Sequence, residues 1–529
     1  MNNNIFKYVF ALVVVVLIGY TFYIIVQNKT DSSDINLDQT STVSNIQKDL
    51  RLAISELDTF NPLLTNNRNV QEISKIVYEP LVTLNENYKL EYCLAEEIAK
   101  VDDCNYIISL RKGVLWQDNT NFTTDDIKFT FDLILADRVS PLYYENIKAV
   151  KNLYIIDSTT FKLELYEPVP FFEYNLTFPI MCAKYYEGED FFNSQKIPIG
   201  TGLFEISEVS SNIIKLIQND TYWDTSRKPM VTEININLYG TIGEAYSAFK
   251  NGEIDLLTVK ANNVEDYIGT LGYKKVEFKA REYDYLVINT EKNILNDPIV
   301  RKTISMVIDK NSIIASCLGA GYVTSNFSLD MGNWLYTRDL NINVDTEAAS
   351  ELLLSNGWNR SRNSWQKNDE SGYRKIQFSI TVDSSNQRRV LVAENIKNQL
   401  ANFGIPVTIN YLSNNNYNNA IDTRNYDCIL AGLNLSFSPN LSTFFGEGNL
   451  ANYHNQEVSD ILNEINNTSE ENVLYERYNR LYQIYLDDAP YIGLFRNTST
   501  VVYNQNLVGN ITPNLFNIYH NIEKWYRQL

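Results

Sequence analysis

The side chains that most often perform chemistry in proteins are scarce in this sequence. Its 529 residues include two histidines and five cysteines, and no Gly-x-Ser-x-Gly, His-Glu-x-x-His or P-loop pattern stands out. A Ser-His-Asp or Cys-His catalytic device is therefore not expected. Asp and Glu number 64 and could supply a glycosidase-like carboxylate pair, but their spacing singles out no pair. We predict that the protein is not an enzyme and that it holds no metal or cofactor.

The cysteines show no Cys-x-x-Cys pair and no metal-like grouping, so zinc and redox chemistry are not expected. A disulfide between Cys93 and Cys104, facing each other across a hairpin, stays open as an alternative. The remaining three, Cys182, Cys317 and Cys428, are predicted to be small buried apolar residues.

Length and charge narrow the class of protein further. A chain of 529 residues is too long for one ordinary core and suggests about three domain-sized units. With 44% hydrophobic and 21% charged residues it is globular. Its net charge of -19 disfavours nucleic acid and an anionic membrane surface as partners, because both repel a negative protein.

The N-terminal residues indicate a compartment. Residues 8–26 contain no charge and, as a helix, are long enough to span roughly 30 Å of hydrocarbon. Lys7 precedes this stretch and Asp31 and Asp34 follow it, so the bulk of the chain is expected outside the cell. No Ala-x-Ala-like cleavage site ends the stretch. We therefore favour a signal anchor at residues 1–29 over a cleaved signal peptide, with residues 30–49 as a flexible stalk.

Residues 106–131, YIISLRKGVLWQDNTNFTTDDIKFTF, combine a strand, a turn and a capped helix. The first residues alternate with the period of two that is typical of a strand, and Gly113 can break it. Thr123 or Thr124 can N-cap a helix, with two aspartates at its positive end. On that helix, three apolar residues are expected to face the core: Ile127, Phe131 and Ile134.

That segment resembles the family 5 extracellular solute-binding proteins of ABC importers, the peptide- and nickel-binding group. The family pattern runs roughly YTFxLRxGVKWHDGxPFTAxDVxFSF, and the chain departs from it at two turn positions. Gln117 stands where the family usually has His, and Asn119 stands where it usually has Gly, although Asn tolerates a left-handed backbone. The family performs no catalysis.

Further matches follow in the family's order from about residue 57 to residue 431. In residues 198–204, PIGTGLF, the two glycines are expected to adopt backbone conformations closed to other residues. Gly357 is expected to end a helix that begins near Asp345. The matching segments are residues 57–62, 78–81, 198–204, 219–223, 251–255, 297–310, 345–358, 404–407 and 426–439.

The resemblance implies an α/β protein with the type II periplasmic-binding-protein fold, and the uncharged residues 8–26 predict a transmembrane helix before it. Two lobes would close over a ligand about a hinge, and an extra domain would pack beside the first lobe. Lobe 1 would comprise residues 50–76, 197–289 and 498–529, the extra domain residues 77–196, and lobe 2 residues 290–497. Two crossing segments, residues 289–290 and 495–497, are expected to act as hinges.

One departure from the family bears on the ligand. In peptide-binding relatives the segment YDxxLxGWxADYPDP supplies an aspartate that pairs with the peptide's amino terminus. In the resembling residues 426–439, Leu433 occupies the Trp position and Ser436 the Asp position. Losing that carboxylate removes a charge-assisted hydrogen bond, so a conventional α-amino anchor is not expected. Asp422 or Asp427 is the remaining alternative, although Asp427 fits the start of a strand better.

Together with the predicted signal anchor, the resemblance implies a membrane-tethered extracellular receptor that hands an oligopeptide-like solute to an ABC permease, and we expect a monomer. A peptide could be gripped through its backbone as an extended strand. The alternatives are a non-peptide solute (an oligosaccharide, a metal chelate or a modified peptide) and a tethered sensor acting through a partner. Trp334, Tyr336 and Phe437 could stack on sugar rings, although such aromatics more often belong to a core. The residues predicted to line the cleft are Phe60, Asn61, Tyr283, Trp334, Asn434, Ser436 and Phe437.

Overall fold

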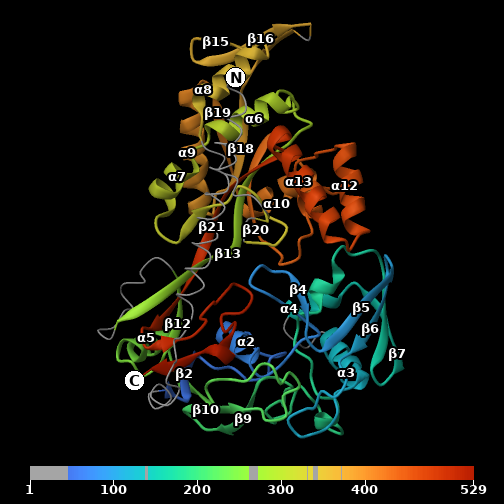
Figure 1. Cartoon of the computed structure of the whole chain (residues 1–529). Coiled ribbons are helices and arrows are strands. Elements are labelled where there is room, and N and C mark those ends of the chain that lie inside the picture. Colours follow the sequence, from blue (N-terminus) through green and yellow to red (C-terminus); the bar gives the residue numbers. More distant parts are fainter. Residues whose placement is uncertain are drawn as a thin grey trace, which may run out of the picture. The chain divides into compact units, whose positions relative to one another are not determined.

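In the computed structural model, the described residues are 46–136, 141–260, 272–329, 332–336, 344–370 and 372–528 (Figure 1). The predicted membrane segment and nearly all of the predicted stalk lie outside these ranges. Within them, no helix combines the length and the apolar character needed to cross a membrane. Contacts divide the chain into one unit of residues 1–47 and 528–529 and another of residues 48–527, and the second unit contains the sheets and helices that position the site.

The largest sheet has seven strands in the order β12-β21-β13-β20-β18-β19, with β14 pairing on β21. Helices lie on both of its faces (Figure 1). Its strands are β12 (Leu256–Lys260), β13 (Tyr273–Ile288), β14 (Tyr322–Thr324), β18 (Phe378–Asp383), β19 (Val407–Leu412), β20 (Cys428–Asn434) and β21 (Tyr491–Asn504).

Two four-stranded sheets precede it in the chain. In the first, ordered β2-β11-β10-β9, β2 and β11 are parallel and the other pairs are antiparallel. The second, ordered β5-β6-β8-β7, is antiparallel throughout. The strands are β2 (Asp49–Ser55), β9 (Phe204–Val209), β10 (Ile213–Gln218) and β11 (Glu233–Tyr239), then β5 (Ala95–Asp102), β6 (Asn105–Leu110), β7 (Val150–Asp157) and β8 (Thr160–Leu165).

The remaining strands form short sheets. β3 (Val82–Leu84) and β4 (Leu90–Tyr92) make a hairpin, and β15 (Asn359–Ser361), β16 (Ser364–Asp369) and β17 (Gly372–Lys375) make a small meander. Near the end of the chain, β22 (Leu507–Val508) pairs with β23 (Tyr526–Gln528). Strand β1 covers Ile46–Gln47.

Helices supply the layers that bury the sheets. In the first half of the chain these are α2 (Arg68–Ser74), α3 (Thr124–Leu135), α4 (Pro141–Ile147) and α5 (Ile242–Lys250). In the second half they are α6 (Pro298–Val307), α7 (Lys310–Ile313), α8 (Thr346–Ser355), α9 (Gln387–Phe403), α10 (Asn414–Thr423), α11 (Ser442–Phe445), α12 (Gln456–Asn466) and α13 (Glu471–Asp488).

The hydrophobic core is divided among these layers. One cluster fills the space around β5 to β8 and α3, and another fills the space around β2 and β9 to β11. On the seven-stranded sheet, one face packs against α6, α8 and α9, and the other packs against α10, α12 and α13. Residues 286 and 288 of β13 face the first of these clusters while residues 283, 285 and 287 face the second, which is the alternation expected of a strand between two helical layers.

The segment of residues 106–131 folds as predicted. Residues 105–110 form β6, Gly113 has φ +78°, and Asn119 adopts the left-handed conformation at φ 64°. Thr123 is the N-cap of α3 and makes a capping box with Asp126. The three apolar residues predicted to face the core are buried.

The glycines of residues 198–204 are needed for a different reason from the one predicted. Neither Gly200 nor Gly202 has a positive φ, so their backbones are open to other residues. Instead, a Cβ at Gly200 would overlap the carbonyl oxygen of Val77, and one at Gly202 would lie 2.6 Å from that oxygen. Close approach of two backbone segments therefore requires these glycines. The Gln117 side chain fastens the same turn by accepting from Gly200 N at 2.9 Å.

The cysteines are all free, so the alternative of a Cys93–Cys104 disulfide is wrong. Cys182 and Cys428 are buried as predicted, whereas Cys317 is half-buried.

Candidate functional site

Two long strands connect the regions in which a ligand site could form. β13 and β21 pair antiparallel from Tyr273↔Asn504 to Val287↔Tyr491. Their ladder is irregular between Lys279 and Tyr283, where four steps along β13 match two steps along β21. On one side of this irregularity the strands pack with the β2 sheet, and on the other side they belong to the core of the seven-stranded sheet. The predicted crossing segment 495–497 lies opposite this point, whereas residues 289–290 lie beyond the end of β13.

Strand β20 has one open edge. It pairs with β13 along its whole length, from Ile288↔Cys428 to Glu282↔Asn434. On its other side it pairs with β18 only at Cys428 and Ile429. In the described part of the chain, therefore, no strand covers that side of β20 from residue 430 onward. On this open side the Tyr417 hydroxyl donates to the Leu430 carbonyl at 2.8 Å, and among the described residues no side chain bonds the backbone of residues 431–434.

A cavity of about 560 Å³ adjoins this open edge. Its volume is in the range of small-molecule binding sites. Polar groups dominate the part of the lining that comes from helices and loops. The lining residues are Tyr285, Asp383, Arg389, Asn414, Tyr417, Asn418, Ile421, Ala431, Gly432, Leu433, Ser442, Thr443, Glu447, Gly448, Asn449 and Leu450.

A buried ion-pair cluster supports one wall of the cavity. Asp284 of β13 receives Arg389 Nε at 2.7 Å and Arg388 Nη2 at 3.2 Å, and its own side chain is 4% exposed. Burial alone would lower the pKa of Arg388, but the charge of Asp284 raises it above the ordinary value. Gly432 faces Asp284 across the two strands, and a Cβ there would overlap Arg389 Nη2. The glycine thus leaves room for the arginine that lines the cavity.

Carboxylates also line this cavity. The Asp383 side chain accepts from the backbone N–H and the hydroxyl of Ser385, and Glu447 is exposed. Neither forms an ion pair with a described residue, whereas the charge of Arg389 is balanced by Asp284. Burial raises the pKa of Tyr417 to about 12, so this tyrosine stays a neutral donor. The cavity therefore offers hydrogen-bond donors, carboxylates and a strand edge to a polar, extended ligand.

Past the end of β20, the chain enters an aromatic cluster formed by segments far apart in sequence. The Phe437 ring stacks on Tyr88 at 5.5 Å and meets Phe516 edge to face at 5.3 Å. Leu84, Tyr174 and Ala280 belong to the same cluster. This cluster therefore joins the β3–β4 hairpin, the crossing part of β13, residues 515–516 and the loop after β20.

Trp334, in the second half of the chain, contacts residues of the β3–β4 hairpin and Tyr174. Its backbone N–H donates to Asn87 O at 2.8 Å, and its indole N–H lies 3.3 Å from the Tyr174 hydroxyl. Lys89 lies over its ring at 5.3 Å and pairs with Glu471 at 2.5 Å.

The structure places the seven predicted cleft residues in different surroundings. Asn434 ends β20 and Ser436 and Phe437 follow it, with Asn434 and Ser436 exposed. Trp334 contacts Tyr174, which belongs to the same aromatic cluster as Phe437. Phe60, Asn61 and Tyr283 are buried, at 7%, 7% and 1% exposure. The side chain of Asn61 accepts from Leu63 N in its own turn, and the Tyr283 ring stacks on Tyr285. None of the seven residues lines the cavity, and their role in ligand binding stays a prediction.

Sequence reasoning missed the cavity's charged residues. Arg389 and Asp383 lie at the junction of β18 and α9, which no motif marked. Two signals were nevertheless present: a charged residue, Asp284, directly before the apolar residues 285–288, and a glycine, Gly432, inside the next strand of the sheet. A buried charge requires a partner, and a strand glycine often marks a close approach.

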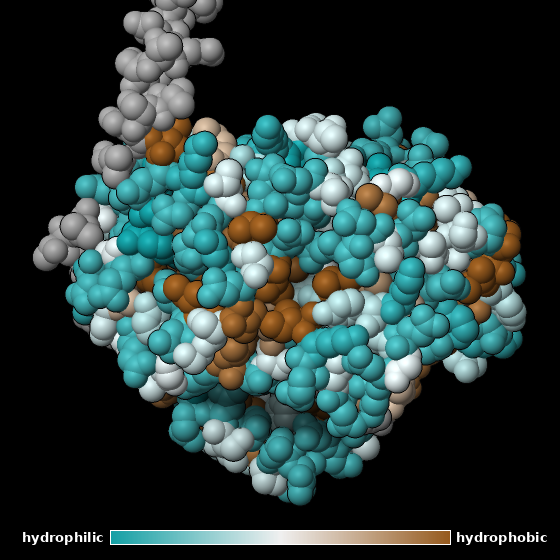
Figure 2. Space-filling view, turned by 90° about the horizontal axis from the view of Figure 1, so that it is seen from below, coloured by the Kyte–Doolittle hydropathy of each residue, from teal (hydrophilic) through white to brown (hydrophobic). Residues whose placement is uncertain are grey.

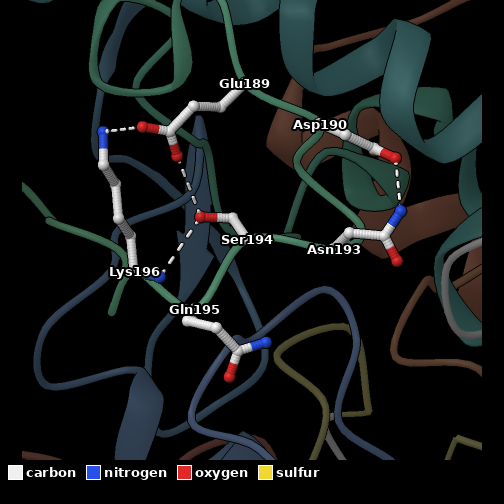
Figure 3. Close-up of a pocket in the computed structure, with 6 residues that line it drawn as sticks. All are labelled: Glu189, Asp190, Asn193, Ser194, Gln195 and Lys196. Carbon is white, nitrogen blue, oxygen red and sulfur yellow. Dashed lines mark hydrogen bonds and ion pairs between the residues drawn. The ribbon is translucent and has the colours of Figure 1, made fainter.

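Two other surface features are weaker candidates for a ligand site. A shallow depression of about 570 Å³ is lined by residues 189–190 and 193–196, whose polar groups mostly bond one another, as Figure 3 shows: Glu189 with Lys196, and Asp190 with Asn193. Figure 2 shows hydrophobic residues across the middle of the lower face, bordered by hydrophilic ones, and also near its right-hand edge. Neither feature combines a strand edge with polar groups left available for a ligand.

An α/β architecture with a cavity beside a central strand, and two long strands crossing between packed regions, defines a binding protein of the type II periplasmic class. Comparison with known proteins agrees. Residues 89–451 match the family model of bacterial extracellular solute-binding proteins, family 5. The chain belongs to this family, and it is accordingly a solute-binding protein.

Relatives cover most of the chain. It is 24% identical over 500 residues to the oligopeptide-binding protein AppA of Bacillus subtilis (strain 168), covering 90% of each protein. It is 22% identical over 475 residues to the periplasmic murein peptide-binding protein MppA of Escherichia coli (strain K12), covering 81% of this chain and 83% of MppA. The structure of a nickel ABC transporter protein from Bacillus halodurans superposes with a TM-score of 0.72 at 19% identity, covering 90% of this chain and 98% of the other. This likeness confirms the type II periplasmic-binding-protein fold.

Proposed function

We propose that the protein captures a peptide on the outer face of the cell and delivers it to an ABC permease. The observation that carries this proposal is the open edge of β20 beside the cavity. An extended peptide can add to such an edge as a strand, so that main-chain hydrogen bonds give affinity while the adjoining space accepts side chains. The names of AppA and MppA, both peptide-binding proteins, support the same ligand class.

We place the hinge at the irregular part of the β13–β21 ladder. Residues 280–282 of β13 and 496–498 of β21 connect two core regions, and an interrupted ladder bends more easily than a regular one. The predicted division into lobe 1, extra domain and lobe 2 fits the separate core clusters, with the β13 crossing displaced from residues 289–290 to residues 280–282.

The sequence supports a proposal for the cellular location and the partners of the protein. A helix at residues 8–26 would tether it to the membrane, and the strongly negative charge would keep it from nucleic acid. It would act as a monomer, without catalysis, with the permease subunits as its membrane partners. An oligosaccharide is not favoured, because the faces of Trp334 and Phe437 already pack against other side chains.

Mass spectrometry of bound solutes tests the proposal. The full chain, purified in detergent, would be incubated with culture-medium extract, washed, denatured, and its released small molecules identified. We expect short peptides, enriched over those released from a Thr443→Trp variant, because Thr443 is exposed and lines the cavity, which the larger side chain would fill. A single sugar or chelate, released in stoichiometric amount without peptides, would contradict the proposal.

A further inference from the structure

We infer that the cavity beside β20 selects a peptide with a cationic side chain, and that Asp383, Glu447 and the Tyr285 hydroxyl supply the acceptors for that cation. The inference rests on the proposed function, because it assumes a peptide along the open edge of β20. It concerns a side chain of the peptide and not its amino terminus. Ser436, which stands at the family's amine-pairing position, does not line this cavity.

The cavity lies where two strands of the large sheet separate. The pairing of β18 with β20 ends at Thr381↔Ile429. Asp383, the last residue of β18, and residues 431–433 of β20 both line the cavity. Because successive side chains of a strand point to opposite faces, a peptide added to this part of β20 presents every second side chain to the same side. One of them can enter the cavity while the backbone stays bonded to the strand.

Two carboxylates of the lining have oxygens left for a ligand. Asp383 accepts from Ser385 N at 2.9 Å and from Ser385 Oγ at 2.8 Å, both through Oδ1, so Oδ2 remains available. Glu447 is exposed, and Arg424, which reaches the same loop, donates to Gly448 O at 2.6 Å. Among the described residues, neither carboxylate forms an ion pair. A cation with N–H donors makes the strongest hydrogen bonds to such groups.

The arginines near the cavity wall are already balanced. Arg389 Nε donates to Asp284 Oδ1 at 2.7 Å, and Arg388 Nη2 donates to Asp284 Oδ2 at 3.2 Å. Arg388 also lies 3.8 Å from Glu282. Two arginines therefore face two carboxylates, and this cluster adds no net charge to the cavity. The charge left on the lining is that of its own two carboxylates, which attracts a cation and repels an anion.

One buried hydroxyl of the lining is also left for a ligand. Tyr285 is 3% exposed, and its ring packs edge to face against Phe444 at 5.4 Å and Tyr491 at 5.8 Å. Tyr285 lines the cavity, and among the described residues no group hydrogen-bonds its hydroxyl. Burial raises the pKa of Tyr285, so the neutral oxygen can accept from an ammonium or a guanidinium group. Because buried polar groups are normally hydrogen-bonded, this hydroxyl indicates a ligand independently of the carboxylates.

Short synthetic peptides of alanine test the inference. Each peptide carries one lysine, norleucine or glutamate, placed at every position in turn, and is made with a free and with an acetylated amino terminus. Equilibrium dialysis against the full chain, followed by mass spectrometry, measures how much of each is retained. We expect the best lysine peptide to be retained about tenfold more than its uncharged norleucine counterpart, and the glutamate peptide least. Acetylation of the amino terminus should leave this ratio unchanged.

Charge-removing variants assign the preference to the carboxylates. Asp383→Asn keeps an acceptor for Ser385, and Glu447→Gln alters an exposed side chain. We expect each variant to lower the ratio of lysine to norleucine peptide about threefold, and the double variant to bring it near one. Glu96→Gln, at an exposed position of β5 outside the lining, is the matched control and should keep the wild-type ratio. Should Asp383→Asn fail to fold, Glu447→Gln decides.

Tyr285→Phe separates a binding role of the hydroxyl from a structural one. The substitution removes the hydroxyl and leaves the packed ring. We expect retention of the lysine peptides to fall about threefold while the unfolding temperature stays equal or rises, because an unbonded buried group is lost. A lower unfolding temperature with unchanged retention would show that the hydroxyl serves the fold, and would overturn its place among the acceptors.

The outcomes separate this inference from the proposed function. Equal retention of lysine and norleucine peptides overturns the cationic selection and leaves peptide binding intact. The same holds for a lysine preference that survives in the double variant or that disappears when the amino terminus is acetylated. Retention of no peptide in any form overturns peptide binding, and the inference falls with it.

Discussion

A single glycine, Gly432, controls whether the cavity wall can form. Replacing it by alanine would place a Cβ 2.6 Å from Asp284 Oδ1 and in overlap with Arg389 Nη2, so the buried ion pair must shift. We expect Gly432→Ala to lower the free energy of unfolding by about 1–3 kcal/mol, as overpacking typically does. Urea denaturation followed by tryptophan fluorescence measures this change.

The matched control is Gly243→Ala in α5, where the nearest atom to a Cβ, Thr241 Oγ1, lies 3.9 Å away. Alanine favours a helix over glycine, so this variant should be unchanged or more stable by up to about 1 kcal/mol. Equal stabilities of the two variants would show that the space around Gly432 is not restrictive.

Glu79 makes the stability depend on pH. Its carboxylate is buried and receives Tyr222 Oη at 2.8 Å, Thr201 Oγ1 at 2.9 Å and Trp223 Nε1 at 2.9 Å. Burial raises the pKa of Glu79, and these donors offset only part of the effect. The folded state therefore holds its proton to higher pH than the unfolded state, whose glutamate titrates near 4.3.

The sign of the effect follows from this difference. The contribution of Glu79 to stability is fully present below the unfolded pKa and is lost as pH rises through the folded pKa. Glu79→Gln, which keeps hydrogen-bonding groups but cannot titrate, should remove that decline. Unfolding free energies measured at several pH values above about 4.3 would therefore fall more steeply in the wild type than in the variant, and parallel curves would contradict the assignment.

At the scale of residues, sequence reasoning located the end of β20 but not the cavity. Ser436 and Phe437 could be predicted because they lie within a segment that resembles the family pattern. Arg389 and Tyr417 come from helices that meet β20 only in the folded chain, and their neighbours in sequence carry no signal of that meeting. The glycines at 200 and 202 illustrate the same limit. The sequence predicts that glycine is required there, but not why, because the close approach to Val77 involves a segment more than a hundred residues away.

At the scale of elements, the start of α3 is fixed by its cap. Thr123 accepts from Asp125 N, and Asp126 closes the capping box by accepting from Thr123 N at 2.8 Å. Thr123→Ala should cost about 1 kcal/mol of unfolding free energy. Ser413→Ala is the matched control, because Ser413 begins α10 without a side-chain cap bond and its loss should cost clearly less. Denaturant unfolding compares the two, and equal losses would argue against the cap.

Elements with local determinants were predicted well, and elements defined by long-range pairing were not. The cap of α3, the Asp345 cap and Gly357 end of α8, and the left-handed Asn119 all follow from residues close in sequence. Strand β13, Tyr273–Ile288, lies in none of the segments that resemble the family. Its earlier residues alternate charged with apolar side chains and form a strand because β21 pairs with them.

At the scale of the whole molecule, Trp334 is expected to control how readily the ligand cleft closes. Its side chain contacts Tyr174 and the Lys89–Glu471 pair, which lie on segments that the proposed hinge would move relative to one another. Trp334→Ala removes these contacts while leaving the cavity beside β20 intact, so the ligand-free variant should populate more open forms. Because only the closed form grips a ligand fully, the apparent dissociation constant for co-purified peptides should rise about tenfold, corresponding to a loss of about 1.4 kcal/mol.

Small-angle X-ray scattering of Trp334→Ala should show a larger radius of gyration without ligand and a wild-type value at saturation. The control is Trp334→Phe, which keeps an aromatic ring beneath Lys89 and should behave almost as the wild type. Equal scattering and affinity for Trp334→Ala and the wild type would show that other residues make the contacts that close the cleft.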